Sequence, residues 1–180
     1  MPGARAEARR ISSLLLDGTD AYEVETKVAD KAGKAAVVAA MRGCDVLHLA
    51  THGEPDAVLL GGATRAEGAL TMAEVQGLEL RAHLVVLSEC DSFRGTLTAD
   101  GVIGVTRAFV AAGALTLVAS LWKVDDDATL ALMSHFYRAL LSSGGVGDAA
   151  SALRSAMVAM IREGRWSVLQ WASFVVYGLA

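Results

Sequence analysis

Short apolar runs alternate along the chain with segments in which apolar residues recur every three to four positions. The first pattern is typical of buried β-strands and the second of amphipathic helices. Helices are predicted over residues 3–16, 33–41, 99–112, 126–141 and 148–161, with a short one after Thr71. Strands are predicted over residues 21–26, 45–51, 83–88, 114–122 and 172–177, and the apolar residues 57–61 end in Gly61-Gly62, a turn or hairpin signal. The alternation predicts an α/β fold with a mainly parallel sheet.

Local residue choices mark several of the element ends. Thr71 with Glu74 three positions later has the spacing of a capping box, which begins a helix. Gly113 follows the helix predicted over 99–112 and fits its C-terminal cap. Residues 142–147 are rich in Ser and Gly and are expected to form the most flexible loop.

Length and composition point to one domain spanning residues 1–180. The chain has 180 residues, of which 53% are hydrophobic and 20% charged, so a disordered segment is excluded. No apolar run approaches the roughly 18 residues of a membrane helix, and the N-terminus lacks the apolar core of a signal peptide. Two cysteines fit a reducing compartment better than a disulfide framework. We therefore expect a cytoplasmic protein that does not enter a membrane.

Several common kinds of site are excluded by charge and motif. The net charge of −4 and the lack of a basic stripe argue against nucleic acid as a direct partner. No phosphate loop, GxSxG, CxxC or HExxH occurs, and residues 145–150 imitate a dinucleotide fingerprint only after a helix, where that motif needs a strand. His48 and His52 would be about 13 Å apart along a strand, too far for one metal ion. No metal or organic cofactor is expected.

Two predicted strands end in residues suited to covalent catalysis. The strand over 45–51 runs into His52 and Gly53, and the strand over 83–88 runs into Cys90. In a parallel sheet such ends meet at one edge, where an imidazole can help a thiolate attack a carbonyl. The amides of Gly53 and Cys90 could form an oxyanion hole, worth about 3 kcal/mol per donor. The alternative is that Cys90 is a buried small residue and His52 a surface residue before a turn.

With these residues the sequence resembles the CHAT domain, a caspase-like cysteine protease domain often found after tetratricopeptide repeats. The resemblance runs through the blocks PGARAEARRISSLL, DVLHLATHG, LTMAEVQGLELRAHLVVLSECDS, GVIGVTRAFVAAGALTLVASLWKVDDDAT, HFYRALL and WASFVVYG. It implies the three-layer α/β/α sandwich of caspases, separases and gingipains. It also implies a dyad of His52 and Cys90, 38 residues apart. A protein substrate and regulation by a partner or attached repeats follow from the same resemblance.

The chain departs from the family pattern in three places. Glu89 stands where a small residue usually precedes the nucleophile, and a carboxylate facing the site would oppose thiolate formation. Phe93 stands where a glycine is common. A strand that lies upstream in relatives has no counterpart before Met1, so we expect the domain to be incomplete at its N-terminus and to lack its first strand.

A pocket for the substrate side chain is expected after the strand over 114–122. By resemblance, Trp122 could form its wall, and Asp125 or Asp126 there would favour a basic side chain. The alternative for both acids is capping of the next helix. Asp91 either contacts the substrate or stabilises a turn.

Two other histidines are assigned structural roles. His48 lies in the middle of a predicted strand, and His135 lies on a predicted helix. Neither position is at a strand end, where chemistry collects in an α/β sheet.

Three functions remain open on the sequence. The favoured one is peptide-bond hydrolysis with Cys90 as nucleophile and His52 as general acid and base. The second is a catalytically inactive interaction module of the same fold, favoured by Glu89, Phe93 and the missing strand. The third is a nucleotide- or phosphate-binding domain, which fits the alternation of strands and helices but lacks a phosphate loop.

Overall fold

The computed structural model describes residues 2–18, 22–54, 57–90, 96–98, 101–143 and 148–178. For residues 2, 29, 30, 52, 53, 89, 90, 96–98 and 101–103 it describes the backbone alone. None of the described helices has the length and apolar character needed to cross a bilayer.

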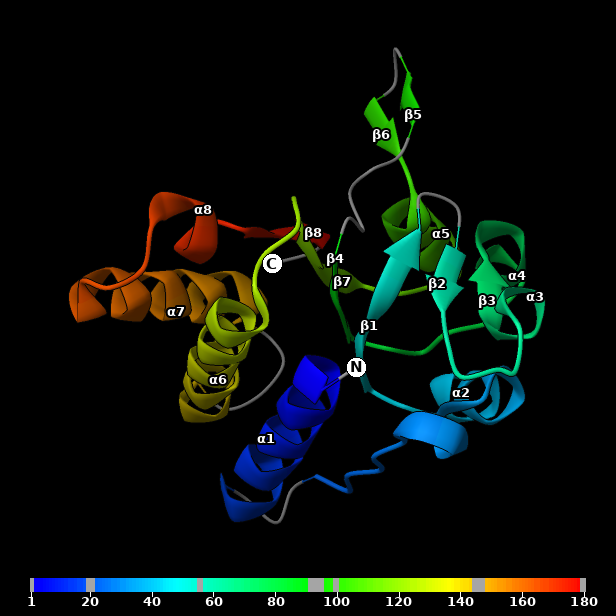
Figure 1. The fold of residues 1–180 in the computed structure, drawn as a ribbon, viewed down its shortest axis with the longest axis horizontal. Helices are drawn as coiled ribbons and strands as arrows, with labels where there is room; N and C mark the ends of the chain where they lie inside the picture. Colours follow the sequence, from blue (N-terminus) through cyan, green and yellow to red (C-terminus); the bar gives the residue numbers. More distant parts are fainter. Residues whose placement is uncertain are drawn as a thin grey trace.

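A six-stranded sheet in the order β3-β2-β1-β4-β7-β8 forms the centre of the molecule (Figure 1). Its strands are β1 (Val46–Glu54), β2 (Ala57–Leu59), β3 (Ala69–Thr71), β4 (Leu84–Cys90), β7 (Thr116–Ser120) and β8 (Phe174–Gly178). The three inner strands β1, β4 and β7 are parallel, and β2, β3 and β8 are added to them in antiparallel pairs. The predicted α/β class with its mainly parallel central sheet is confirmed.

Helices cover both faces of the sheet and complete three layers (Figure 1). One face packs on α1 (Pro2–Gly18), α6 (Asp126–Ser142) and α7 (Ala149–Glu163), with α8 (Val168–Trp171) beside them. The other face packs on α2 (Lys34–Met41), α4 (Met72–Gln76) and α5 (Val105–Ala111). A 3-10 helix over Ala29–Ala32 precedes α2, and α3 (Arg65–Gly68) precedes β3. A separate ribbon of β5 (Thr96–Thr98) and β6 (Gly101–Ile103) leads into α5.

Strand β4 explains why its sequence reads as one apolar run. Val85 and Leu87 belong to the core cluster under α2 and α5, whereas Leu84 and Val86 belong to the cluster under α1 and α6. Successive side chains of a strand point to opposite faces, so a strand covered on both sides needs apolar residues at every position.

Most predicted elements are found, and two predictions are wrong. The strand predicted over 21–26 is not found, because in the described part of the chain no strand lies beside the extended segment 22–28 to pair with it. The helix predicted over 99–112 begins only at Val105, because residues 101–103 pair with 96–98 in the ribbon. The short elements β3, α3 and α8 were not predicted. Residues 144–147 of the expected flexible loop lie outside the described residues.

Candidate functional site

The ends of β1 and β4 bring the two predicted reactive residues together. The two strands run parallel, and their register ends on the pair His52 with Cys90. Residues 38 apart in sequence therefore occupy neighbouring positions at one edge of the sheet. Gly53 follows in β1 and pairs with Val58 of β2, while Glu89 pairs with Thr51. Two further residues from the sequence analysis, Asp91 and Phe93, lie outside the described residues.

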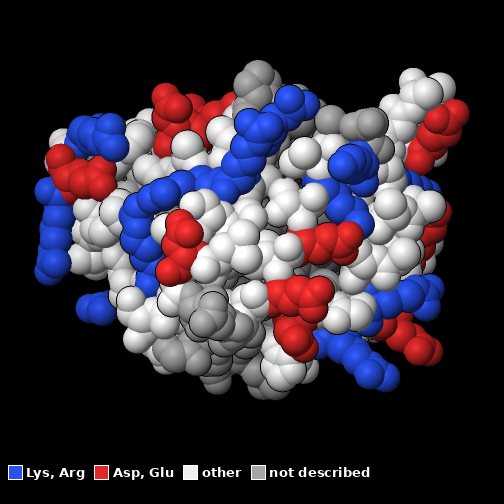
Figure 2. Space-filling view, turned by 90° about the horizontal axis from the view of Figure 1, so that it is seen from below, with Lys and Arg blue, Asp and Glu red and all other residues white. Residues whose placement is uncertain are grey.

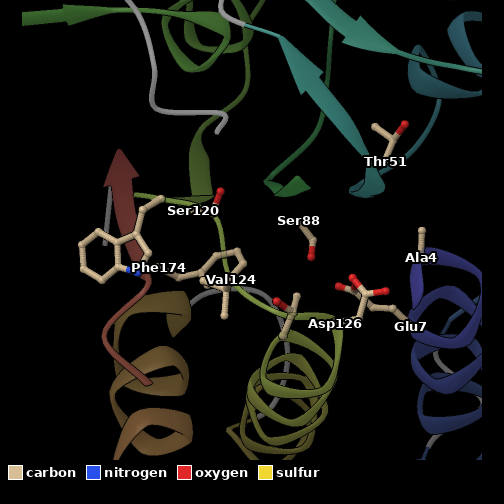
Figure 3. Close-up of a pocket in the computed structure, with 10 residues that line it drawn as sticks. Ala4, Glu7, Thr51, Ser88, Ser120, Val124, Asp126 and Phe174 are labelled. Carbon is tan, nitrogen blue, oxygen red and sulfur yellow. The ribbon is translucent and has the colours of Figure 1, made fainter. Parts of the chain in front are cut away.

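A pocket opens beside these strand ends, on the face of the sheet that packs on α1 and α6 (Figure 3). It is small, with a volume of about 30 Å³, which is room for about two water molecules. Its lining comes from four strands, two helices and the segment after β7: Ala4, Glu7, Thr51, Ser88, Ser120, Trp122, Val124, Asp126, Thr129 and Phe174.

Ser88 is the unusual member of this lining. It is 7% exposed, and its Oγ has no hydrogen-bond partner among the described residues. Figure 3 shows its hydroxyl directed into the space that Glu7 and Asp126 also face. A buried hydroxyl without a partner costs about 1–3 kcal/mol, so this position is unfavourable for folding alone.

The carboxylate of Glu7 is held in place by a buried chain of hydrogen bonds. Nε2 of His48 lies 3.1 Å from Oε1 of Glu7, and Nδ1 of His48 lies 3.0 Å from the hydroxyl of Tyr137. Burial, together with the charge of Glu7, raises the pKa of Tyr137, so this hydroxyl remains a donor. Tyr137 then donates its O–H to Nδ1 of His48, and Nε2–H of His48 donates to Glu7. Each proton in this series of hydrogen bonds therefore has an acceptor. His48 thus has a structural role, as its mid-strand position suggested.

Trp122 lies in the pocket wall, whereas Asp125 caps the helix that follows. Trp122 lines the pocket, and its Nε1–H donates to the carbonyl of Leu169 at 2.7 Å, which fixes the indole against α8. Asp125 is the N-cap of α6 and accepts from the amide of Ala128 at 2.9 Å and from Gln170 at 2.8 Å. The hydrogen bond from Gln170 is the main cause that lowers the pKa of Asp125.

The predicted capping role of Asp125 is therefore confirmed. A contact between Asp125 and a substrate stays a prediction. Asp126, the next residue, lies in the first turn of α6 and contributes its side chain to the pocket.

Cys44 and His135 lie apart from the pocket. Cys44 is a free, half-buried cysteine whose Sγ is 3.4 Å from the carbonyl of Met41. Burial raises the pKa of its thiol, so Cys44 is a poor nucleophile. His135 joins α6 to α7 through a 2.8 Å hydrogen bond to Glu163.

Metal ligands and surface charge add little to this picture. In the described part of the chain, no three His, Cys, Asp or Glu side chains come together as a metal site would require. Figure 2 shows Lys and Arg intermingled with Asp and Glu on the face viewed there. The described part of that face is therefore of mixed charge.

Sequence reasoning missed Glu7 and Ser88. Glu7 precedes Ile11 by four positions, so it lies on the buried side of α1, and a carboxylate in an apolar stripe was the available signal. Ser88 is the one hydroxyl in the strand sequence HLVVLS, just before the predicted reactive residues. Both signals become specific only when α1 is known to pack on β1 and β4.

The sequence is similar to a described domain family and to two longer proteins. The sequence model of the CHAT domain matches residues 1–179. Tetratricopeptide repeat protein 28 from Homo sapiens is 36% identical over 113 residues, and the Mus musculus protein is 36% identical over 109 residues. Each alignment covers 61% of this chain and 4% of the relative, so the chain spans a small part of those proteins.

A solved structure shares the fold. The Arg specific cysteine proteinase gingipain R superimposes with a TM-score of 0.65 at 13% sequence identity. The match covers 96% of this chain and 40% of the gingipain chain. It supports the caspase-like fold, with the sheet and its flanking helices arranged as described above.

Proposed function

The chain belongs to the CHAT domain family, and we propose that it is a caspase-like cysteine endopeptidase that cleaves a protein substrate. The observation that carries the proposal is the register of β1 and β4, which pairs His52 with Cys90 at the end of two parallel strands. This is the edge at which α/β sheets bind and transform ligands. The family and the fold supply the context, and the paired residues supply the chemistry.

The proposed reaction uses only groups of the chain and water. His52 takes the proton of the Cys90 thiol, and the thiolate attacks the carbonyl carbon of the scissile peptide bond. The backbone amides of Gly53 and Cys90 stabilise the oxyanion, and His52 then gives its proton to the leaving amine. Water, deprotonated by His52, hydrolyses the thioester and restores the thiol. Neither a metal nor an organic cofactor is needed, because attack and proton transfer are both performed by side chains.

The substrate-binding residues of the proposal are Asp91, Trp122 and Asp125. Trp122 is supported by its position in the pocket wall. Asp125 is assigned to the same region because it caps α6, the helix that begins at the pocket, and accepts a hydrogen bond from Gln170. Asp91 directly follows Cys90 in the sequence and is assigned on that proximity.

The relatives and the cysteines bear on how the enzyme is regulated and where in the cell it is found. The relatives are tetratricopeptide repeat proteins, which supports control of activity by such repeats or by a partner that carries them. The two cysteines and the unpaired state of Cys44 fit a reducing compartment, so we place the protein in the cytoplasm.

The test is the reactivity of Cys90 with iodoacetamide as a function of pH, measured in a Cys44→Ala background. We expect a thiol pKa below the usual value of about 8.5, returning toward that value when His52→Ala is added. Cys90→Ala is the control for labelling elsewhere. Equal reactivity with and without His52 would refute the dyad and leave an inactive interaction module. A reactivity that rises in Glu89→Ala would show that this carboxylate opposes the thiolate.

A further inference from the structure

The small pocket beside the strand ends holds two carboxylates whose charge is not balanced there. Glu7 enters it from α1 and Asp126 from the first turn of α6, and among the described residues no Lys or Arg lines it. His48 donates to Glu7 but accepts from Tyr137 on its other nitrogen, so it is a neutral ring and adds no positive charge. The lining of this pocket therefore favours a cation.

The carboxylate of Glu7 is buried and only partly satisfied by the fold. Glu7 is 5% exposed, and Nε2 of His48, 3.1 Å from Oε1, is its hydrogen-bond partner within the described chain. Oε2 has no such partner there, so its lone pairs are available to another group. An ionised carboxylate is costly to bury unless it is paired, and a cation in the pocket would pair with it.

The carboxylate of Asp126 lies against the first turn of α1. A Cβ atom at position 3 would collide with the side chain of Asp126 in its present place, and Gly3 has no such atom. The packing of α1 on the start of α6 thus brings Asp126 to the same pocket as Glu7. Two carboxylates from different helices can therefore act on one ion.

The hydroxyl of Ser88 is independent evidence for a ligand. Ser88 is 7% exposed, and its Oγ has no partner among the described residues. Figure 3 shows this oxygen directed into the space that Glu7 and Asp126 face. A hydroxyl oxygen has lone pairs that a cation can use, and Thr129 of α6 brings a second hydroxyl residue to the lining. The pocket thus combines charged and neutral oxygen donors.

These donors and the size of the pocket favour calcium over other metal ions. Transition metals are typically held by three or more His, Cys, Asp or Glu ligands, and the described residues contain no such group. Calcium is bound by oxygen atoms, so hydroxyl groups and water can complete a site that has two carboxylates. Magnesium keeps several of its water molecules, and a volume of about 30 Å³ leaves little room for them.

From this arrangement we infer that the pocket binds one calcium ion between Glu7 of α1, Ser88 of β4 and Asp126 of α6. The ion joins two helices to the end of β4, where Ser88 lies two residues before Cys90. Its role is to hold these elements together, and it takes no part in the proposed reaction. The inference goes beyond the proposed function and does not rest on it, since it needs no reactive cysteine.

The first experiment measures binding with terbium(III), which replaces calcium at oxygen sites and emits when a nearby tryptophan is excited. Trp122 lines the pocket and should sensitise this emission, so Trp122→Phe should abolish it. We expect saturable emission that calcium competes away, with an affinity at least tenfold weaker in Glu7→Gln and Asp126→Asn and severalfold weaker in Ser88→Ala.

Asp127→Asn is the matched control for this titration. It removes the same charge from the same helix turn, but Asp127 does not line the pocket, so terbium should bind this variant as it binds the parent chain. Equal affinities in Asp126→Asn and Asp127→Asn overturn the inference.

The second experiment measures thermal unfolding by circular dichroism in calcium, in magnesium and in sodium chloride of equal ionic strength. A ligand that binds only the folded chain raises its Tm. We expect the largest rise in calcium, a smaller one in magnesium and none in sodium chloride, and we expect Asp126→Asn but not Asp127→Asn to lose the calcium effect. No rise at about 10 mM calcium, roughly tenfold above the dissociation constants of weak calcium sites, overturns the inference. Equal rises in both divalent ions overturn the assignment to calcium.

Discussion

The two faces of strands β1 and β4 are built in opposite ways. On the face toward α2 and α5, Leu49 and Leu87 belong to a continuous apolar cluster. On the face toward α1 and α6, the apolar cluster is interrupted by His48 and, at the end of β4, by Ser88. Of these two polar residues, Ser88 lies toward the C-terminal end of its strand, where the pocket opens.

The polar groups of the mixed face differ in whether they are satisfied within the fold. Burying polar groups costs free energy unless each finds a partner. His48 has two partners, Glu7 and Tyr137, so its cost is offset within the fold. Ser88 has none among the described residues, so its cost is not offset by the described part of the fold. The apolar face therefore stabilises the fold, whereas the mixed face contains a buried hydroxyl that reduces stability beside the pocket.

The strongest way to break this comparison is to truncate neighbouring residues on the two faces. Leu87→Ala removes a fully buried side chain from the apolar cluster and should lower the free energy of unfolding by about 2–5 kcal/mol. Ser88→Ala removes a hydroxyl without a partner and should leave that free energy unchanged or raise it by up to about 1 kcal/mol. Urea unfolding monitored by circular dichroism measures both.

Equal slopes of free energy against urea in the two variants are needed, since a changed slope would report a changed unfolded or native state. The comparison fails if Ser88→Ala destabilises as much as Leu87→Ala. In that case the serine hydroxyl would be part of the folded core, and its role in binding would lose support.

A smaller effect is expected from the hydrogen-bonded chain on the mixed face. Tyr137→Phe removes the hydroxyl that donates to His48 and leaves Nδ1 buried without a partner. The free energy of unfolding should fall by about 1–3 kcal/mol, again measured by urea unfolding. Tyr22→Phe, at a half-buried residue outside every helix and strand, is the control and should change it by less than about 0.5 kcal/mol. If both variants behave alike, the chain through His48 does not hold α1 to the sheet.

The apolar face was the easier one to predict from sequence. Runs such as HLVVLS identify buried strands because each residue carries its own signal, and Thr71 with Glu74 forms the predicted capping box. The segment over 22–28 shows the limit of such signals, since alternating residues do not make a strand without a neighbour to pair with.

The site was predicted only in part, and for a related reason. His52 and Cys90 could be expected at one edge because parallel strands end together, and their register places them side by side. Glu7 could not, because its partner His48 is 41 residues away and the position of Glu7 depends on how α1 packs. Long-range packing of a helix on a sheet leaves no short motif in the sequence.

The smallest effect concerns the rim of the apolar face, where α2 meets α4. Nζ of Lys34 lies 2.6 Å from Oε1 of Glu74, and this bond, with those from Thr71, lowers the pKa of Glu74 to about 2. Because the folded pKa is lower than the unfolded one, the pair stabilises the fold above pH 4.5, and this is lost as pH falls toward 2. Lys34→Met should raise the pKa of Glu74, observed by NMR of its side-chain carboxyl carbon.

Glu163 is the matched control for this titration. Its pKa is also lowered to about 2, but by hydrogen bonds from Trp166, His135 and Arg165 on the other side of the sheet, so Lys34→Met should leave it unchanged. Both carboxylates are exposed, where water and salt weaken ion pairs, so the stability at neutral pH should hardly change. A large loss of stability in Lys34→Met would mean that the apolar face depends on an ion pair at its rim. The view that apolar packing alone stabilises this face would then be wrong.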